Sequence, residues 1–287
     1  MPANDIRIHV AYHRTTPPIA NACLAPIHAG RAIAKAPVPN MPGDDTGDAI
    51  SSKNLSYCEL TVIYWMWRNV QASHYGLFHY RRLLNLNPSF TVKQTICDAS
   101  ASTLARYHLD AEHIIAACNA HDIILPLPRM LDGLSVTQQY AKHHHADDLD
   151  ICADIIRTRH AGYIQDMEKT FADNRGYFFN MFIMRGDIFH EYAAWLFDIL
   201  TEAEKRITVS DDPYQRRVFG FLAERLSGVF VEHKRRTSSL RIRECPLVIG
   251  DFDATFFKRL RHWRKNNFSV RLGKGRCSAT LFGKRVL

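Results

Sequence analysis

The feature that most constrains the fold is an alternation of strand-like and helix-like segments along the first 250 residues. In IRIHVAYH (6–13), apolar residues alternate with polar ones, which is the pattern of a half-buried strand. Further strands are predicted at 75–82, 121–129, 177–186, 227–233 and 242–250. Helical segments lie between several of them, and this order predicts an α/β fold with helices packed on a mixed or parallel sheet.

Capping residues mark the predicted helix starts. Ser56 and Glu59 fit a capping box in front of a helix whose apolar face begins at Leu60. A longer helical region is predicted at 135–173, where Asp147 is a candidate cap.

The composition is that of a soluble globular protein, with 46% hydrophobic and 23% charged residues. No apolar run reaches the roughly 18 residues that a membrane span needs. The N-terminus lacks the basic start and apolar core of a signal peptide, so export is not expected. The seven cysteines are scattered and never spaced C-x-x-C, which argues against a zinc site or a disulfide framework and fits a reducing cytoplasm.

The net charge of +8 belongs to the C-terminal tail. From Asp251 onward, ten Lys/Arg stand against two Asp, whereas residues 1–250 carry 27 charges of each sign. We therefore predict a main domain at 1–250 and a basic, aromatic tail at 251–287. A helix around Trp263 would have an aromatic face and a basic face, the pattern of a helix that lies on an anionic membrane. The alternative is that these aromatic residues pack on the main domain.

One candidate anion site lies in YGLFHYRR (75–82). Ligands of open α/β sheets bind beyond the carboxyl ends of the strands. Arg81 and Arg82 stand at such an end, next to His79 and Tyr80, and adjacent guanidinium groups can fork onto phosphate oxygens. The alternative is a surface strand end whose arginines pair with neighbouring carboxylates.

A second candidate lies in DDPYQRRVFGFLAERL (211–226). Arg217 and Glu224 share a face of the predicted helix and could project into a site, whereas Asp211 and Asp212 stand at its start. The alternative interpretation makes the two aspartates helix caps and the other two residues part of a solvated face.

Two motifs have weaker chemical meaning. The segment KHHHADD (142–148) contains three adjacent histidines, but these point in different directions on a helix, which favours an exposed helix end over a metal site. Asn180 lies among large apolar residues in FFNMFIM, where its amide needs partners, either a sugar hydroxyl or the backbone.

The loop GDDTGDAISSKNLSYCEL (43–60) has two interpretations. Asp44, Asp45 and Asp48 could hold a divalent metal, or the stretch could be a turn-rich loop that leads into a helix. The chain has no dinucleotide-binding, P-loop, serine-hydrolase or zinc-protease motif. No apolar strand ends in Asp-x-Asp, the motif with which many sugar transferases hold a metal.

Eight segments, taken in order, resemble a bacterial domain family long labelled as of unknown function. Members occur in capsule, exopolysaccharide and lipopolysaccharide gene products. The family is similar to galactosyltransferases, including galactofuranosyltransferases that build O-antigen galactan. The resemblance covers about residues 6–250. The segments are YHRTTPP, GDDTGDAISSKNLSYCELTVIYWMWRN, YGLFHYRR, ILPLPR, QQY, YFFNMFIM, WLFDIL and DPYQRRVFGFLAERL.

The resemblance implies a compact A-type glycosyltransferase fold, a UDP-sugar donor, a glycan or glycolipid acceptor and inversion at the anomeric carbon. It also implies that no metal or other cofactor is needed, and nucleic acid is not an expected partner. The loop at 43–60 would lie beside the donor pocket, where its aspartates would bind sugar or ribose hydroxyls or order the loop. The donor-binding residues expected on this basis are Tyr12, His13, Asp44, Asp45, Asp48, Asn54, Glu59, His79, Tyr80, Arg81, Arg82, Asn180 and Arg217.

Such a transfer needs positive charge at the leaving diphosphate and a carboxylate that takes the proton of the acceptor hydroxyl. Arg81 and Arg82 would supply the charge, with His79 and Arg217 as further candidates. The candidate bases are Asp211, Asp212 and Glu224, of which Asp212 is favoured.

Two other functional classes stay open. One is a metal-dependent hydrolase or transferase that uses the Asp44, Asp45 and Asp48 loop. The other is a non-enzymatic module that binds membrane or nucleic acid through the basic tail. The expected location is the cytoplasm, at the inner face of the plasma membrane.

Overall fold

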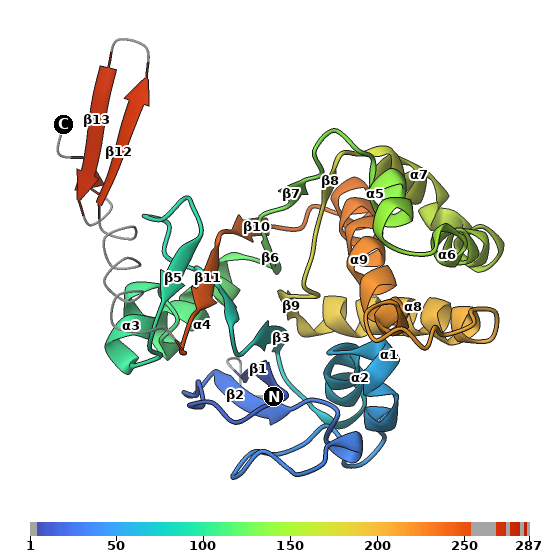
Figure 1. Ribbon diagram of the computed structural model, residues 1–287. Coiled ribbons are helices and arrows are strands. Elements are labelled where there is room, and N and C mark those ends of the chain that lie inside the picture. Colours follow the sequence, from blue (N-terminus) through green and yellow to red (C-terminus); the bar gives the residue numbers. More distant parts are fainter. Residues whose placement is uncertain (1–4, 254–267, 274–275, 282–283, 286–287) are drawn as a thin grey trace.

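The computed structural model describes residues 5–253, 268–273, 276–281 and 284–285 (Figure 1). Within them, the main element is a mixed sheet of nine strands. The strands of this sheet are β1 (Ile6–Tyr12), β2 (Leu24–His28), β3 (His74–His79), β4 (Arg82–Leu84), β5 (Gln94–Ile96), β6 (Ile123–Pro126), β9 (Phe182–Arg185), β10 (Ile242–Cys245) and β11 (Leu247–Gly250).

The sheet combines parallel and antiparallel strand pairs. Strand β1 pairs in parallel with β2 on one side and with β3 on the other. Strand β9 runs antiparallel between β3 and β6, and β10 pairs in parallel with β6. From β3 the sheet also continues through β4 and β11 to β5. A separate two-stranded ribbon joins β7 (Arg129–Met130) to β8 (Arg175–Gly176).

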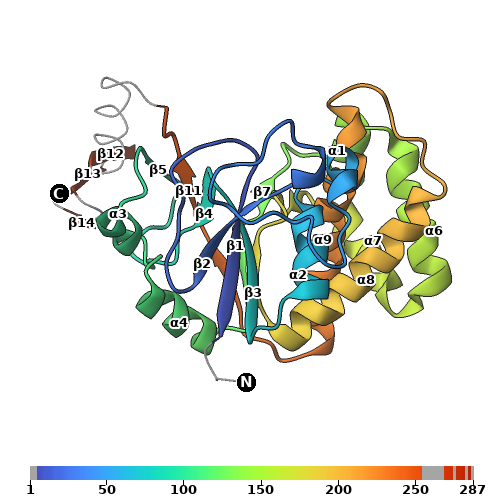
Figure 2. The ribbon, with the colours of Figure 1, turned by 90° about the horizontal axis from the view of Figure 1, so that it is seen from below.

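Helices lie on both faces of the sheet (Figure 2). The helices are α1 (Asn54–Tyr57), α2 (Leu60–Asn69), α3 (Ala101–Arg106), α4 (Ala111–Ala120), α5 (Val136–His143), α6 (Ala146–Arg159), α7 (Ile164–Ala172), α8 (Gly186–Glu204) and α9 (Val218–Thr237). One core packs the sheet against α2, α8 and α9, and a second packs it against α3 and α4. The predicted first strand is confirmed as β1, but both of its faces are buried. Ile8 and Val10 lie in the second core, and on the other face His9 and Ala11 are 7% and 5% exposed.

Three local predictions are wrong. Residues 227–233 are not a strand, because α9 continues through them with Leu222, Leu226 and Phe230 buried at helical spacing. The capping box at Ser56 is absent, since Ser56 lies inside α1 and donates its hydroxyl hydrogen bond to the Lys53 carbonyl. The candidate cap Asp147 lies in the first turn of α6, behind the N-cap residue His145.

The tail contributes β12 (Phe268–Gly273), β13 (Arg276–Leu281) and β14 (Lys284–Arg285), which form their own antiparallel sheet. The predicted basic helix around Trp263 lies outside the described residues. Among the helices that the structure describes, none is both long and apolar enough to cross a bilayer.

Candidate functional site

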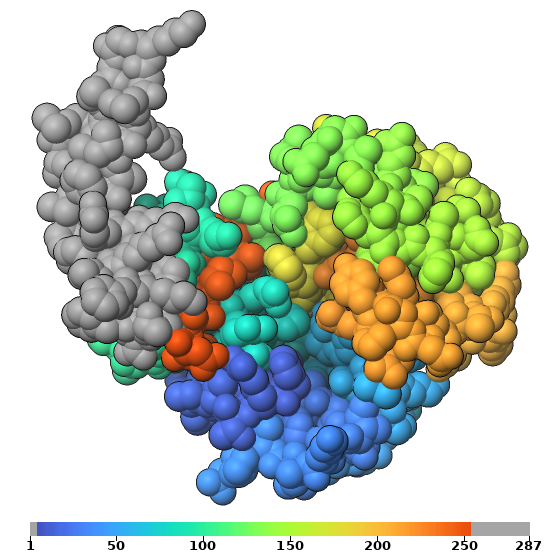
Figure 3. Space-filling model, in the orientation of Figure 1, coloured from blue at the N-terminus to red at the C-terminus, as the bar shows by residue number. Residues whose placement is uncertain are grey.

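The carboxyl ends of β1 and β3 meet at one edge of the sheet, because Ala11 is in register with His79. Beyond them, the His13 and Tyr80 rings contact edge to face with centroids 5.2 Å apart. Tyr12 stacks on Tyr80 from the interior, at 5.5 Å. In the space-filling view the surface is hollowed where the segments near residues 80 (teal) and 180 (yellow) meet (Figure 3). This is the edge at which α/β proteins bind ligands.

Three guanidinium groups gather here, and we call Arg81, Arg82 and Arg217 the arginine cluster. Burial and the neighbouring charge of Arg81 lower the pKa of Arg82. Within the described residues no ion pair joins any of the three to a carboxylate. Instead, Arg82 lies over the Phe179 ring at 4.6 Å and Arg217 over the Phe221 ring at 5.3 Å. The charges of Glu59 and Glu224 act on Arg82 and Arg217 from beyond ion-pair distance. Guanidinium groups that gather without a direct ion pair form a site for an anion such as phosphate.

The segment before β9 holds a strained backbone beside this cluster. Phe179 and Asn180 have φ of 78° and 50°, and Cys58, in front of α2, has φ of 51°. The Asn180 side chain donates to Glu59 Oε1 at 2.8 Å and to the Gly220 carbonyl at 3.1 Å. Positive φ at residues other than glycine costs about 1–3 kcal/mol each and collects at functional sites. The surrounding hydrogen bonds hold these residues in place.

The charged form is disfavoured in both histidines of the site, because their pKa values are lowered. Burial lowers the pKa of His79, whose Nε2–H donates to the Phe179 carbonyl at 2.7 Å. Burial and the charge of Arg81 lower the pKa of His13. The positive charge that a ligand meets at this edge therefore comes from the arginines.

Glu224 of α9 is a largely buried carboxylate, with its side chain 14% exposed. Its Oε1 accepts the Phe179 N–H at 2.7 Å, and its Oε2 accepts from Arg225 Nη1 at 2.9 Å. Burial raises the pKa of Glu224 to about 7, although the Arg225 charge opposes this shift. A carboxyl group that titrates near neutral pH is suited to general acid–base chemistry.

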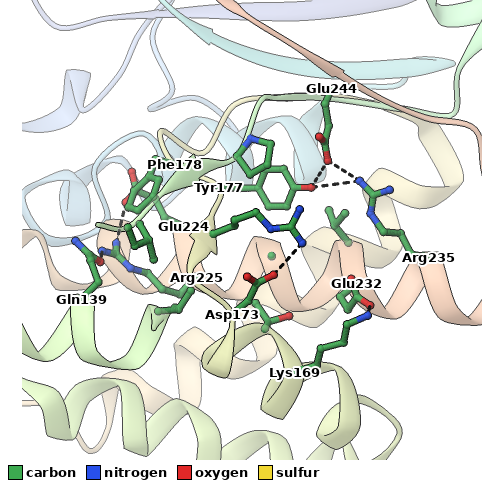
Figure 4. A pocket seen from close by; sticks show the side chains of 18 residues that line it. Gln139, Lys169, Asp173, Tyr177, Phe178, Glu224, Arg225, Glu232, Arg235 and Glu244 are labelled. Carbon is green, nitrogen blue, oxygen red and sulfur yellow. Dashed lines mark hydrogen bonds and ion pairs between the residues drawn. The ribbon is translucent and has the colours of Figure 1, made fainter. Parts of the chain in front are cut away.

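Glu224 also lines a cavity of about 330 Å³, which we call the α9 pocket (Figure 4). Segments from α5, α7, α9, β8 and the end of β10 enclose it. The lining residues are Pro128, Leu131, Val136, Gln139, Lys169, Thr170, Asp173, Arg175, Gly176, Tyr177, Phe178, Glu224, Arg225, Gly228, Val231, Glu232, Arg235 and Glu244.

Asp44 has a structural position inside its loop. It is fully buried, and its carboxylate accepts the N–H groups of Gly30 and Arg31 and the hydroxyls of Ser51 and Thr61. These contacts occupy its oxygens, so of the two roles expected for Asp44 the structure favours the ordering of the loop.

The other members of this loop also have partners within the fold. Asp45 and Asp48 are exposed, and Asn54 is half-buried. Their contacts are Arg31 for Asp45, Arg68 for Asp48, and the Cys58 carbonyl for Asn54. Donor binding by these three residues stays a prediction.

Asp211 and Asp212 lie in an exposed stretch before α9. Asp212 Oδ1 accepts the backbone N–H groups of Tyr214 and Gln215, each at 2.9 Å, which is cap geometry. A catalytic role for either aspartate stays a prediction.

The structure adds residues that the sequence did not single out. Cys58 Sγ accepts a hydrogen bond from Arg217 Nε at 3.2 Å. The Phe179 ring lies under Arg82, and the Phe179 N–H donates to Glu224. Arg225 forms an ion pair with Glu224. The apolar run around Phe179 gave no signal of a left-handed backbone. Across the described part of the chain, no group of three or more His, Cys, Asp or Glu side chains is placed to hold a metal ion.

Comparison with known proteins agrees with this arrangement. Residues 7–235 match the model of a family described as a domain of unknown function, DUF4422. The chain belongs to this family. The DUF4422 region contains β3, nearly all of β1 and α9, and every residue of the arginine cluster. The family resemblance expected from the sequence is confirmed.

One solved structure is closely similar to this DUF4422 chain. It is the apo structure of WbbM, a bifunctional glycosyltransferase, with a TM-score of 0.83 and 29% sequence identity. The match covers 86% of this chain but 46% of WbbM, so the chain spans less than half of that protein. No curated protein matches the chain. The predicted α/β fold class is confirmed, and the fold is that of a glycosyltransferase structure.

Proposed function

We propose that this protein is a glycosyltransferase that moves a sugar from a nucleotide-diphosphate donor to a glycan acceptor. The observation that carries this proposal is the arginine cluster, which makes no direct ion pair with a carboxylate in the described residues and lies beside the buried Glu224. The similarity to the WbbM glycosyltransferase supports the same class of reaction.

In the proposed reaction the acceptor oxygen attacks the anomeric carbon as the bond from that carbon to the diphosphate breaks. The bonding electrons leave with the diphosphate, and its growing negative charge is stabilised by Arg81, Arg82 and Arg217. The proton of the acceptor hydroxyl passes to a carboxylate. A single displacement of this kind inverts the anomeric configuration.

We place Glu224 in the role of the base. Its burial and its pKa of about 7 support this assignment, because a base works best when it titrates near the working pH. The sequence favoured Asp212, but that carboxylate caps backbone N–H groups in an exposed stretch. Glu59, whose Oε1 accepts from the Asn180 amide, is assigned to a hydroxyl of the donor.

Our proposals for the donor sugar, the acceptor and the metal requirement rest on the family resemblance. We propose a UDP-linked galactosyl or galactofuranosyl donor, an acceptor in capsule or lipopolysaccharide synthesis, and a reaction without metal. The proposed site of action is the inner face of the plasma membrane, reached through the basic tail.

A screen of the purified protein against nucleotide sugars tests this function. We expect release of UDP from a UDP-hexose, at an equal rate with or without chelator. Activity that chelator abolishes and manganese restores would contradict the metal-independent reaction. Absence of turnover with every nucleotide sugar and every glycan acceptor offered would contradict the function itself.

A further inference from the structure

We propose that the α9 pocket binds the terminal, uncharged sugar of the acceptor glycan. This inference rests on the proposed function and assigns its acceptor side to a defined place. The argument comes from the charge balance of the pocket, its apolar walls and its contact with Glu224.

The charges of the pocket cancel. Every charged side chain in its lining is paired with another member of the lining. The pairs are Lys169 with Glu232, Arg175 with Asp173 at 3.1 Å, Arg225 with Glu224 at 2.9 Å, and Arg235 with Glu244 at 2.6 Å. The arginine cluster has the opposite character, because its guanidinium groups make no direct ion pair with a carboxylate in the described residues. A diphosphate therefore suits the cluster, and a neutral ligand suits the pocket.

The walls of the pocket match a sugar ring. Tyr177 and Phe178 supply aromatic surface, and Leu131, Val136 and Val231 supply aliphatic surface. A sugar has apolar C–H faces that pack on such walls, whereas its hydroxyls donate to carboxylates and accept from guanidinium groups. The volume of about 330 Å³ lies at the small end of the range for ligand sites, about 300–1,000 Å³.

Glu224 connects the pocket to the arginine cluster. It lines the pocket beside Arg225 and Gln139, and Figure 4 shows these three together at one end of the cavity. Glu224 Oε2 accepts from Arg225, and Glu224 Oε1 accepts the N–H of Phe179. The Phe179 ring lies under the guanidinium group of Arg82. A sugar in the pocket would thus place a hydroxyl near Glu224, the proposed base. Only Phe179 would lie between Glu224 and Arg82, which belongs to the cluster proposed to hold the donor diphosphate.

The test separates the two sites by their ligands. Thr170, a half-buried residue of α7, lines the pocket, so Thr170→Trp should fill it. Thr158→Trp on the exposed surface of α6 is the matched control. Methyl glycosides of galactose, glucose and N-acetylglucosamine are examined by saturation-transfer NMR, and UDP by calorimetry. Tyr177→Ala, which removes a wall instead of filling the cavity, serves as a second variant, and melting curves show that each variant is folded.

We expect at least one glycoside to bind the native protein, the Thr158→Trp control and an Arg82→Ala variant, and not to bind Thr170→Trp or Tyr177→Ala. UDP affinity should be unchanged by the pocket variants and fall about tenfold or more in Arg82→Ala. If UDP binds but no glycoside does, or if a pocket variant weakens UDP, the pocket assignment is wrong. If glycosides behave as expected and UDP does not bind, the pocket stands and the proposed donor class is wrong.

Discussion

Replacing Glu224 by glutamine tests the proposed base, because the change keeps the shape of the side chain and removes its ability to accept a proton. Loss of a positioned base lowers turnover about 10²- to 10⁴-fold. In the native enzyme kcat/KM should rise with pH and level off above about pH 7, where Glu224 becomes ionised. The variant should lose this rise. Glu168→Gln on the exposed surface of α7 is the matched control.

The same substitution has a signature in stability. The folded protein binds the Glu224 proton more tightly than the unfolded chain, since burial raises the pKa from 4.5 to about 7. The stabilising contribution is therefore full below pH 4.5 and is lost as the pH rises through 7. Between about pH 5 and about pH 8, the free energy of unfolding should fall by about 2.5 kcal/mol more in the native protein than in Glu224→Gln.

Denaturant unfolding at both pH values measures this difference, and initial rates of UDP release measure the activity. A native enzyme whose rate is flat between pH 5 and pH 9 would refute the reasoning. So would an active Glu224→Gln variant. If Asp212→Asn were inactive while Glu224→Gln retained its rate, the base would be Asp212.

Three other predictions follow from the described contacts and from the tail. Arg82→Ala should lower turnover about 10²-fold, because one preorganised charge is lost. Arg157→Ala, on the exposed surface of α6, should leave turnover unchanged, and steady-state kinetics measure both variants. Asp44→Ala should lower the free energy of unfolding by about 3 kcal/mol or more, because four donors, three of them buried, lose their acceptor; an unchanged melting temperature would contradict this. Deletion of residues 255–287 should abolish sedimentation with anionic vesicles at low salt, and equal binding by the truncated protein would refute docking through the tail.

Much of the sheet edge was predictable from the sequence because a strand end is a local feature. The alternating residues of β1 and the apolar run of β3 indicated strands, and the general rule for α/β sheets then pointed to His79, Arg81 and Arg82. The parallel register that brings β1 beside β3 is the step that the fold adds. Local periodicity failed at 227–233, where a short apolar run fits a strand and a buried helix equally well.

The partners of the polar residues were not predictable, because they come from distant parts of the chain. Asp44 is of a residue type that can ligate a metal, yet its carboxylate is buried and accepts the hydroxyls of Ser51 and Thr61. Glu59 has the spacing of a capping residue, yet its carboxylate accepts from Asn180, which follows it by 121 positions. Whether a carboxylate caps, supports or reacts depends on such tertiary contacts.

The contrast between the arginine cluster and the α9 pocket explains how one chain could distinguish two substrates that both contain sugars. Both regions are rich in arginine, so composition does not separate them. The difference is the direct ion pair: Arg225 and Arg235 contact carboxylates at 2.9 and 2.6 Å, whereas Arg81 and Arg82 make no such pair in the described residues. A diphosphate gains most where the cations are unpaired, and in the pocket it would have to displace a carboxylate that is already in contact. A neutral glycan meets no such penalty, so the two ligands would sort to opposite sides of Glu224.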